Sequence, residues 1–208
     1  RTPLATILSS LTLVSRYAEQ GDKERQSKHV ERIKSSVTHL TDILNDMLSI
    51  SKLEEGAVTL NLEEFNLREF IQGLIMEMKP ISKAGQQILY VHQGNDVVYL
   101  DKKIMRHIIF NLVSNAIKFS PENKPIEVST GIKGNQVQIN IADHGIGISK
   151  EDQQHLFERF FRGHNASNIQ GTGLGLNIVS KYTELLGGFI EFESELDRGT
   201  VFKLTFIQ

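Results

Sequence analysis

The chain has 208 residues, of which 39% are hydrophobic, and its 23 Lys and Arg nearly balance 25 Asp and Glu. This balance, together with the lack of a basic run, excludes nucleic acid and an anionic membrane surface as the main partner. The lack of cysteine excludes disulfides and thiolate metal sites, and no apolar run approaches the ~20 residues of a membrane span.

Two helices are predicted at the start of the chain. Apolar residues from Leu4 to Ala18 fall on one helical face, and the polar segment 19–22 interrupts the pattern. In the next helix, apolar residues from Val30 to Met47 recur three and four positions apart as a heptad seam. Because two helices bury such a seam poorly, residues 1–54 are predicted to dimerise as half of a four-helix bundle. The alternative is a hairpin packed on its own C-terminal domain.

A second domain is predicted over residues 55–208, because the periodicity changes near residues 54–56. Helical patterns cover 67–84 and 102–120, with a strand pattern over 87–100 between them, and two hairpins follow within 125–143 and 188–206. The predicted fold class is therefore α+β. A helical hairpin precedes an α/β sandwich in which helices cover one face of a mixed, mostly antiparallel sheet.

The long helix 102–120 carries polar residues that share one face. Asn111, Asn115 and Lys118 are spaced i, i+4 and i+7, while Ile108 and Leu112 face the core. Amide oxygens beside an ammonium group suit a triphosphate that carries Mg²⁺. The alternative is a solvated helix face with two asparagines, and the segment taken alone favours that alternative.

A strand pattern runs into Asp143, Gly145 and Gly147. A carboxylate only accepts hydrogen bonds, so Asp143 can bind the amine of adenine but would meet the oxygen of guanine unfavourably. The two glycines would let the chain turn closely around a flat ring. An ordinary Asp-x-Gly turn after a strand is the alternative.

Residues 170–177 read QGTGLGLN, with glycines at alternate positions before a predicted helix. Inside a helix, glycine is roughly 1 kcal/mol less favourable than alanine, so these glycines must serve a purpose other than helix formation. Unpaired N–H groups at a helix start suit phosphate oxygens, although the spacing fits neither a P-loop nor a Rossmann site. A glycine-rich connection between packed elements is the alternative.

The order of these segments resembles the ATP-binding domain of sensor histidine kinases, in the superfamily shared with gyrase, heat-shock chaperones and mismatch-repair ATPases. NLVSNAIKFS (111–120) resembles the N box, DHGIG (143–147) the G1 box, LFERFFRG (156–163) the F box and GTGLGL (171–176) the G2 box. RTPL (1–4) resembles the end of the phosphoacceptor motif H-E-x-R-T-P-L, which the other superfamily members lack.

This resemblance implies ATP and Mg²⁺ as cofactors and assigns roles to single residues. Asn115 is expected to ligate Mg²⁺, Asn111 to support metal and phosphate, and Lys118 to contact phosphate. Phe119 would flank adenine, where the family more often has Tyr, and Asp143 would bind the adenine amine.

The resemblance also implies that Arg162 reaches the γ-phosphate and that the polar segment between Arg162 and Gly171 is the ATP lid. The backbone of the G1 and G2 boxes is expected to surround the nucleotide. Those residues are Gly145, Gly147, Gly171, Thr172, Gly173, Leu174, Gly175 and Leu176.

The implied function is the catalytic core of a two-component sensor kinase, in which a helix-borne His receives the γ-phosphoryl group and a response-regulator receiver domain takes it onto an Asp. The accepting His is expected three residues before Arg1, and none of the seven histidines in the chain is an obvious substitute. The chain as given is therefore expected not to phosphorylate itself. Thr2 is expected to orient water during dephosphorylation of the regulator, with a helix-surface Thr beside Pro3 as the alternative.

The resemblance further implies a homodimer through residues 1–54 and a membrane-anchored parent protein with this region in the cytoplasm. The second candidate function is an ATP-gated conformational module of the gyrase and chaperone type, in which no phosphoprotein forms. A Ser/Thr protein kinase of the same superfamily is disfavoured by the helical hairpin and by RTPL.

Overall fold

The computed structural model describes residues 2–166, 169 and 171–208. The chain forms two compact units, Arg1–Lys52 and Leu53–Gln208. Within the described part, no helix has both the length and the apolar character that a bilayer crossing needs.

The first unit is a helical hairpin of α1 (Thr2–Glu19) and α2, which runs over Lys23–Glu54. Gly21, with a φ of 70°, makes the turn, and the Asp22 side chain accepts the Arg25 N–H at 3.0 Å to cap α2. Much of the predicted apolar seam remains exposed in the single chain. The exposed apolar residues of the hairpin are Leu4, Leu8, Leu11, Val37, Leu44, Met47 and Leu48.

The second unit contains two sheets. Strand β1 (Leu62–Asn66) pairs antiparallel with β3 (Val97–Asp101). A five-stranded sheet has the order β2-β4-β5-β7-β6, in which only the β2–β4 pair is parallel. Its strands are β2 (Ile88–Gly94), β4 (Ile126–Lys133), β5 (Gln136–Asp143), β6 (Phe189–Glu195) and β7 (Gly199–Ile207).

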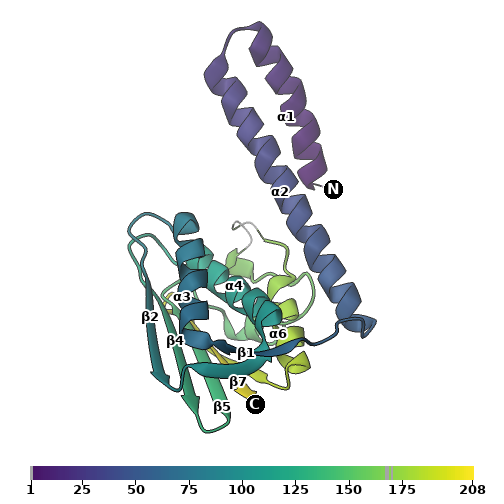
Figure 1. Cartoon of the computed structure of the whole chain (residues 1–208). Coiled ribbons are helices and arrows are strands. Elements are labelled where there is room, and N and C mark those ends of the chain that lie inside the picture. Colours follow the sequence, from purple (N-terminus) through teal and green to yellow (C-terminus); the bar gives the residue numbers. More distant parts are fainter. Residues whose placement is uncertain (1, 167–168, 170) are drawn as a thin grey trace. The chain divides into compact units, whose positions relative to one another are not determined.

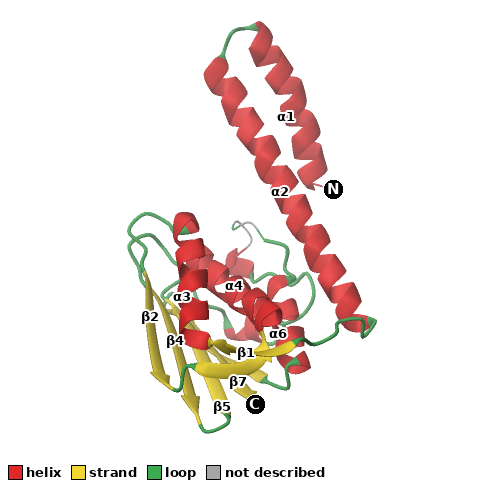
Figure 2. Cartoon of the chain, in the orientation of Figure 1, coloured by secondary structure: helices red, strands yellow, loops and turns green. Residues whose placement is uncertain are grey.

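Three helices lie over one face of the five-stranded sheet (Figures 1 and 2). They are α3 (Leu67–Met78), α4 (Lys102–Phe119) and α6 (Gly175–Leu185). The short elements are η1 (Lys79–Ile81), α5 (Lys150–Gln153) and η2 (His164–Ala166). The side chain of Asp101 caps α4 by accepting the Ile104 N–H at 2.9 Å, and the helix ends before Pro121.

Helix α4 forms the centre of the core. Its apolar side chains are buried against the inward residues of β4 and β5, which alternate with exposed ones as in a sheet covered on one face. The buried residues of α4 are Ile104, Met105, Ile108, Ile109, Leu112, Val113, Ala116 and Ile117. The predicted fold class is confirmed.

The prediction of one strand over residues 87–100 was wrong. Gly94, with a φ of 88°, turns the chain so closely that a Cβ there would lie 2.1 Å from the Ile132 carbonyl oxygen. The chain after this turn forms β3, which pairs with β1 in a separate sheet. Strand β1 was not predicted, because LEEFN carries two charged residues and little β propensity.

We expect the exposed apolar face of the hairpin to hold two chains together. Leu44 is 60% exposed in the single chain, so Leu44→Asp places a charge on that face and should convert a dimer to a monomer in sedimentation equilibrium. Ser35→Asp, on the opposite face of α2, is the matched control and should leave the dimer intact. A monomeric unmodified chain would contradict the dimer prediction.

Candidate functional site

Helix α4 presents the predicted polar face beside the core. Asn111, Asn115 and Lys118 are half-buried, whereas Ile108 and Leu112 on the other side are fully buried. The Asn111 side chain donates to the carbonyl of His107 at 3.0 Å, which holds the side chain against its own helix. The periodicity therefore placed this face correctly on α4.

The carboxyl end of α4 is fixed by two side chains that sequence reasoning missed. Lys83 Nζ donates to the carbonyl oxygens of Lys118 at 2.7 Å and Ser120 at 2.6 Å. Gln86 Nε2 donates to the carbonyls of Ile117 at 3.2 Å and Pro121 at 3.1 Å. The last carbonyls of a helix have no partner within it, and a cation there also complements the helix dipole.

Asp143 lies at the end of β5, where the chain turns back toward α4. Its Oδ1 accepts the Gly145 N–H at 2.8 Å. Burial raises the pKa of the Asp143 carboxyl above its usual value, although the backbone N–H groups of Gly145 and Thr200 partly oppose that rise. A Cβ at Gly145 would lie 2.6 Å from the Phe119 carbonyl oxygen, so this glycine lets the turn pack against the end of α4.

The glycine-rich segment 171–176 packs against the same face of α4. A Cβ at Gly171 would lie 2.6 Å from Lys118 Nζ, and one at Gly175 would lie 2.7 Å from Asn111 Oδ1. The N-cap residue of α6 is Leu174, which has no polar side chain to cap the first N–H groups of that helix. The open N-terminus of α6 therefore faces the polar side chains of α4.

Gly173 needs its bare backbone for a different reason. Its φ is 72°, and a Cβ there would lie 2.7 Å from the carbonyl carbon of Phe160. The segment therefore packs against the backbone of the F box 156–163. Thr172 Oγ1 accepts the Leu174 N–H at 3.1 Å, and Leu174 is fully buried, while Leu176 is half-buried in the first turn of α6.

Two cations converge beside this segment. Lys118 Nζ lies 5.0 Å from the centre of the Phe119 ring, and Arg162 donates to the Ala166 carbonyl at 2.9 Å. Burial, and after it the positive charge of Arg162, lower the pKa of Lys118. Cations placed near one another favour the approach of an anion.

The structure thus brings together the residues that sequence reasoning placed on α4, on the turn after β5 and on the glycine-rich segment. Thr2 begins α1 in the other unit, and its side chain lies outside the described part of the structure. Residues 167, 168 and 170 of the expected ATP lid also lie outside the described residues. Gly147, with a φ of 62°, turns the chain after Asp143 as expected.

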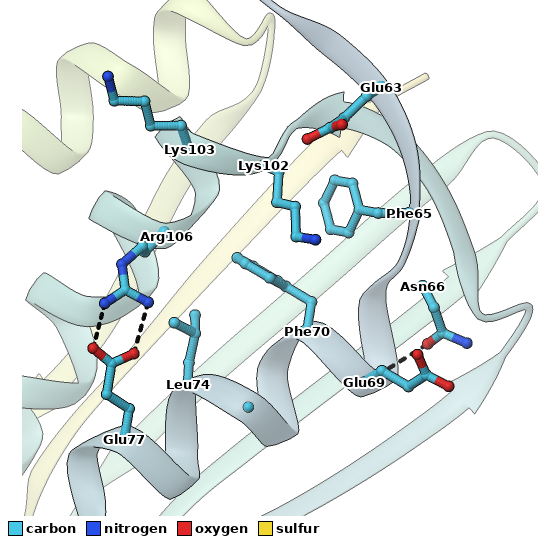
Figure 3. Close-up of a pocket in the computed structure, with 11 residues that line it drawn as sticks. Glu63, Phe65, Asn66, Glu69, Phe70, Leu74, Glu77, Lys102, Lys103 and Arg106 are labelled. Carbon is cyan, nitrogen blue, oxygen red and sulfur yellow. Dashed lines mark hydrogen bonds and ion pairs between the residues drawn. The ribbon is translucent and has the colours of Figure 1, made fainter.

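A cleft of 710 Å³ lies elsewhere, between β1, α3 and the N-terminal half of α4. Lys102 Nζ lies 5.8 Å and 6.0 Å from the ring centres of Phe65 and Phe70, and Arg106 donates to Glu77 at 2.8 Å (Figure 3). Two of its charged lining residues, Arg106 and Glu77, thus form an ion pair, and Lys102 packs over two aromatic rings. The residues lining this cleft include none of those predicted to bind nucleotide.

Two families match the two parts of the chain. "Histidine kinase-, DNA gyrase B-, and HSP90-like ATPase" matches residues 100–208, and "His Kinase A (phospho-acceptor) domain" matches residues 1–56. The chain belongs to the sensor histidine kinases. The ATPase domain of such kinases binds ATP, and the phosphoacceptor domain implies dimerisation.

A curated relative agrees with this membership. The histidine kinase is 30% identical to "Signal transduction histidine-protein kinase ArlS" of Staphylococcus haemolyticus, over 99% of this chain and 46% of the relative. It therefore spans less than half of that relative's length.

Solved structures share the fold. ShkA in complex with AMPPNP is 26% identical with a TM-score of 0.75, covering 88% of this chain and 38% of that one. Histidine kinase ThkA in complex with response regulator protein TrrA is 24% identical with a TM-score of 0.71, covering 97% of this chain and 58% of that one.

The packing at Gly173 can be tested against a matched glycine. Gly173→Ala and Gly187→Ala both place a side chain at a φ near 70°, which costs about 1–2 kcal/mol, but only the Gly173 variant also meets a neighbouring backbone. Amide hydrogen exchange in peptides covering residues 157–163 and 171–178 should accelerate in Gly173→Ala and stay unchanged in Gly187→Ala. Equal exchange in the two variants would contradict the proposed packing.

Proposed function

We propose that the second unit binds Mg²⁺-ATP and that its γ-phosphoryl group passes to a helix-borne His, expected three residues before Arg1, and then to an Asp of a response-regulator receiver domain. The observation that carries this proposal is the convergence of Lys118 and Arg162 beside the open N-terminus of α6. Both cations and the helix N-terminus favour phosphate oxygens. The AMPPNP bound to the related ShkA adds support.

The adenine is proposed to lie at the junction of β5 and α4. The Asp143 carboxylate would accept a hydrogen bond from the exocyclic amine, and the Phe119 ring would supply an apolar surface for the base. The turn through Gly145 and Gly147 would pass close to the ring, since neither residue carries a side chain. These contacts occupy the end of the sheet next to the carboxyl end of α4.

The residues on α4 fit a magnesium ion held together with the phosphates. Asn115 is half-buried on the same face as Asn111, whose amide oxygen lies against the Gly175 backbone. A hard cation takes neutral amide oxygens and phosphate oxygens together, and one protein ligand suffices when phosphates supply the rest. In the proposal, Asn115 ligates the ion and Asn111 supports it, while Lys118 neutralises phosphate charge.

Phosphoryl transfer needs no nucleophile within the nucleotide site, because positioning and charge neutralisation supply most of its catalysis. Arg162 is proposed to meet the γ-phosphate. Residues 1–54 would form the homodimer, a His expected three residues before Arg1 would accept the phosphate, and Thr2 would orient water against the phosphorylated regulator. The proposal extends to a membrane-anchored parent protein with this region in the cytoplasm.

The base contact predicts nucleotide selectivity. ATP should bind at least ~10-fold more tightly than GTP in calorimetry, since a hydrogen bond to a charged group contributes about 1.5–3 kcal/mol. Asp143→Asn keeps an oxygen for the Gly145 N–H but loses the charge, so it should remove most of the difference. Asp197→Asn, in an exposed turn, is the matched control. Equal affinities for ATP and GTP in the unmodified chain would rule out the base contact.

Labelling of the protein by ATP, and the acid lability of that label, distinguish a histidine kinase from an ATP-gated conformational module. A longer chain that carries the complete motif H-E-x-R-T-P-L should become labelled from γ-labelled ATP, with a phosphate that is lost in acid and kept in base. The 208-residue chain, in which none of the seven histidines lies in that motif, should remain unlabelled. An unlabelled longer chain that still binds ATP would favour the conformational module instead.

A further inference from the structure

Asp152 is a buried carboxylate for which the proposed chemistry has no direct use. Its side chain is only 3% exposed. One oxygen accepts the backbone N–H of His164 at 3.0 Å, and the other lies 2.8 Å from Nδ1 of the His164 ring. Burial acts to raise the pKa of Asp152, but the hydrogen bonds from His164 and Ser149 outweigh it and lower that pKa. Asp152 therefore stays ionised and holds its partners.

The residues bound by Asp152 form a short turn directly after Arg162. The Ala166 N–H donates to the Gly163 carbonyl at 2.9 Å, which closes the turn over residues 163–166. The carbonyl of Ala166 in turn accepts a hydrogen bond from Arg162 at 2.9 Å, and the carbonyl of Ile169, just beyond the turn, accepts a second one at 2.5 Å. A chain of contacts thus runs from the buried carboxylate through the turn to the Arg162 guanidinium.

A second anchor fixes the same turn to the base of the site. Asn165 Nδ2 donates to the carbonyl of Gly147 at 3.0 Å and lies 3.4 Å from that of Ile146. Gly147 itself belongs to the turn that follows Asp143. The turn 163–166 is therefore held at one side by α5 and at the other by the segment proposed to surround adenine.

We propose that Asp152 is a positioning residue for phosphoryl transfer, which holds the turn 163–166 so that the Ala166 carbonyl orients Arg162 toward the γ-phosphate. This inference rests on the proposed function, in which Arg162 meets that phosphate. Loss of a merely structural contact would weaken all nucleotides alike. Loss of a contact that acts through Arg162 weakens only nucleotides with a γ-phosphate.

The test is calorimetry of the 208-residue chain with Mg²⁺-AMPPNP and Mg²⁺-ADP. Asp152→Asn turns one acceptor oxygen into an N–H donor facing His164, so AMPPNP affinity should fall about tenfold while ADP affinity changes little. Arg162→Gln should cause a similar selective loss, and the double variant should lose no more than Arg162→Gln alone. Glu151→Gln, which removes the same charge from an exposed neighbour on α5, should change neither affinity.

If Asp152→Asn does not fold, His164→Ala provides a second variant that tests the same positioning role. The His164 ring is 89% exposed, so its removal takes no apolar packing from the core, and the His164 backbone N–H still binds Asp152. This variant should therefore cause a smaller loss, again restricted to AMPPNP. Equal weakening of both nucleotides, or additive losses in the double variant, would overturn the positioning role. If the unmodified chain binds neither nucleotide, the proposed function fails. If it binds both and Arg162→Gln changes their ratio while Asp152→Asn and His164→Ala do not, only the role of Asp152 fails. If Arg162→Gln leaves the ratio unchanged as well, the proposed contact of Arg162 with the γ-phosphate also fails.

Discussion

The carboxyl end of α4 is the constraint on which the rest of the second unit depends. The same helix buries its apolar face in the core and carries the polar residues of the candidate site, so a shift of its last turn would move both. Lys83 and Gln86 hold that turn by its otherwise unpartnered carbonyls. Each such bond with a charged donor contributes roughly 1.5–3 kcal/mol, which is large against a domain stability of about 5–15 kcal/mol.

The candidate site places the ammonium group of Lys118 in a partly buried position under the influence of a second cation. Lys118 is half-buried, its pKa is lowered by burial and by the positive charge of Arg162, and a Cβ at Gly171 would lie 2.6 Å from its Nζ. Two approaching cations destabilise one another unless an anion lies between them. Under the proposed function, this part of the chain would give up local stability in order to bind phosphate, as expected where function and folding compete.

The sequence predicted the elements with strong periodicity and missed contacts between distant segments. The spacing of Asn111, Asn115 and Lys118 placed one helix face correctly, because a 3.6-residue repeat is local information. The turn at Gly94 and the pairing of β1 were missed, since a short charged strand is specified by its partner rather than by its own residues. Lys83 carried no signal either, because its acceptors are 35 and 37 residues away.

The roles within the site came from the order of the motifs, and the structure adds the distances between them. Gly171 and Gly175 lie so close to Lys118 and Asn111 that a side chain at either position would meet them. A propensity scale carries no information about such contacts between distant segments. The pairing of Asp152 with His164 could not be predicted from the sequence either, since neither residue belongs to a periodic segment. The family membership explains why the motifs occur together, and the packing explains how they meet.

A crystal structure of the chain with AMPPNP and Mn²⁺ in place of Mg²⁺ tests the central claim most directly. The account predicts adenine against Asp143, phosphates between Lys118 and the N-terminus of α6, and an anomalous manganese peak beside the Asn115 amide oxygen. Nucleotide bound in the cleft between α3 and α4, or a metal site away from Asn115, would contradict it.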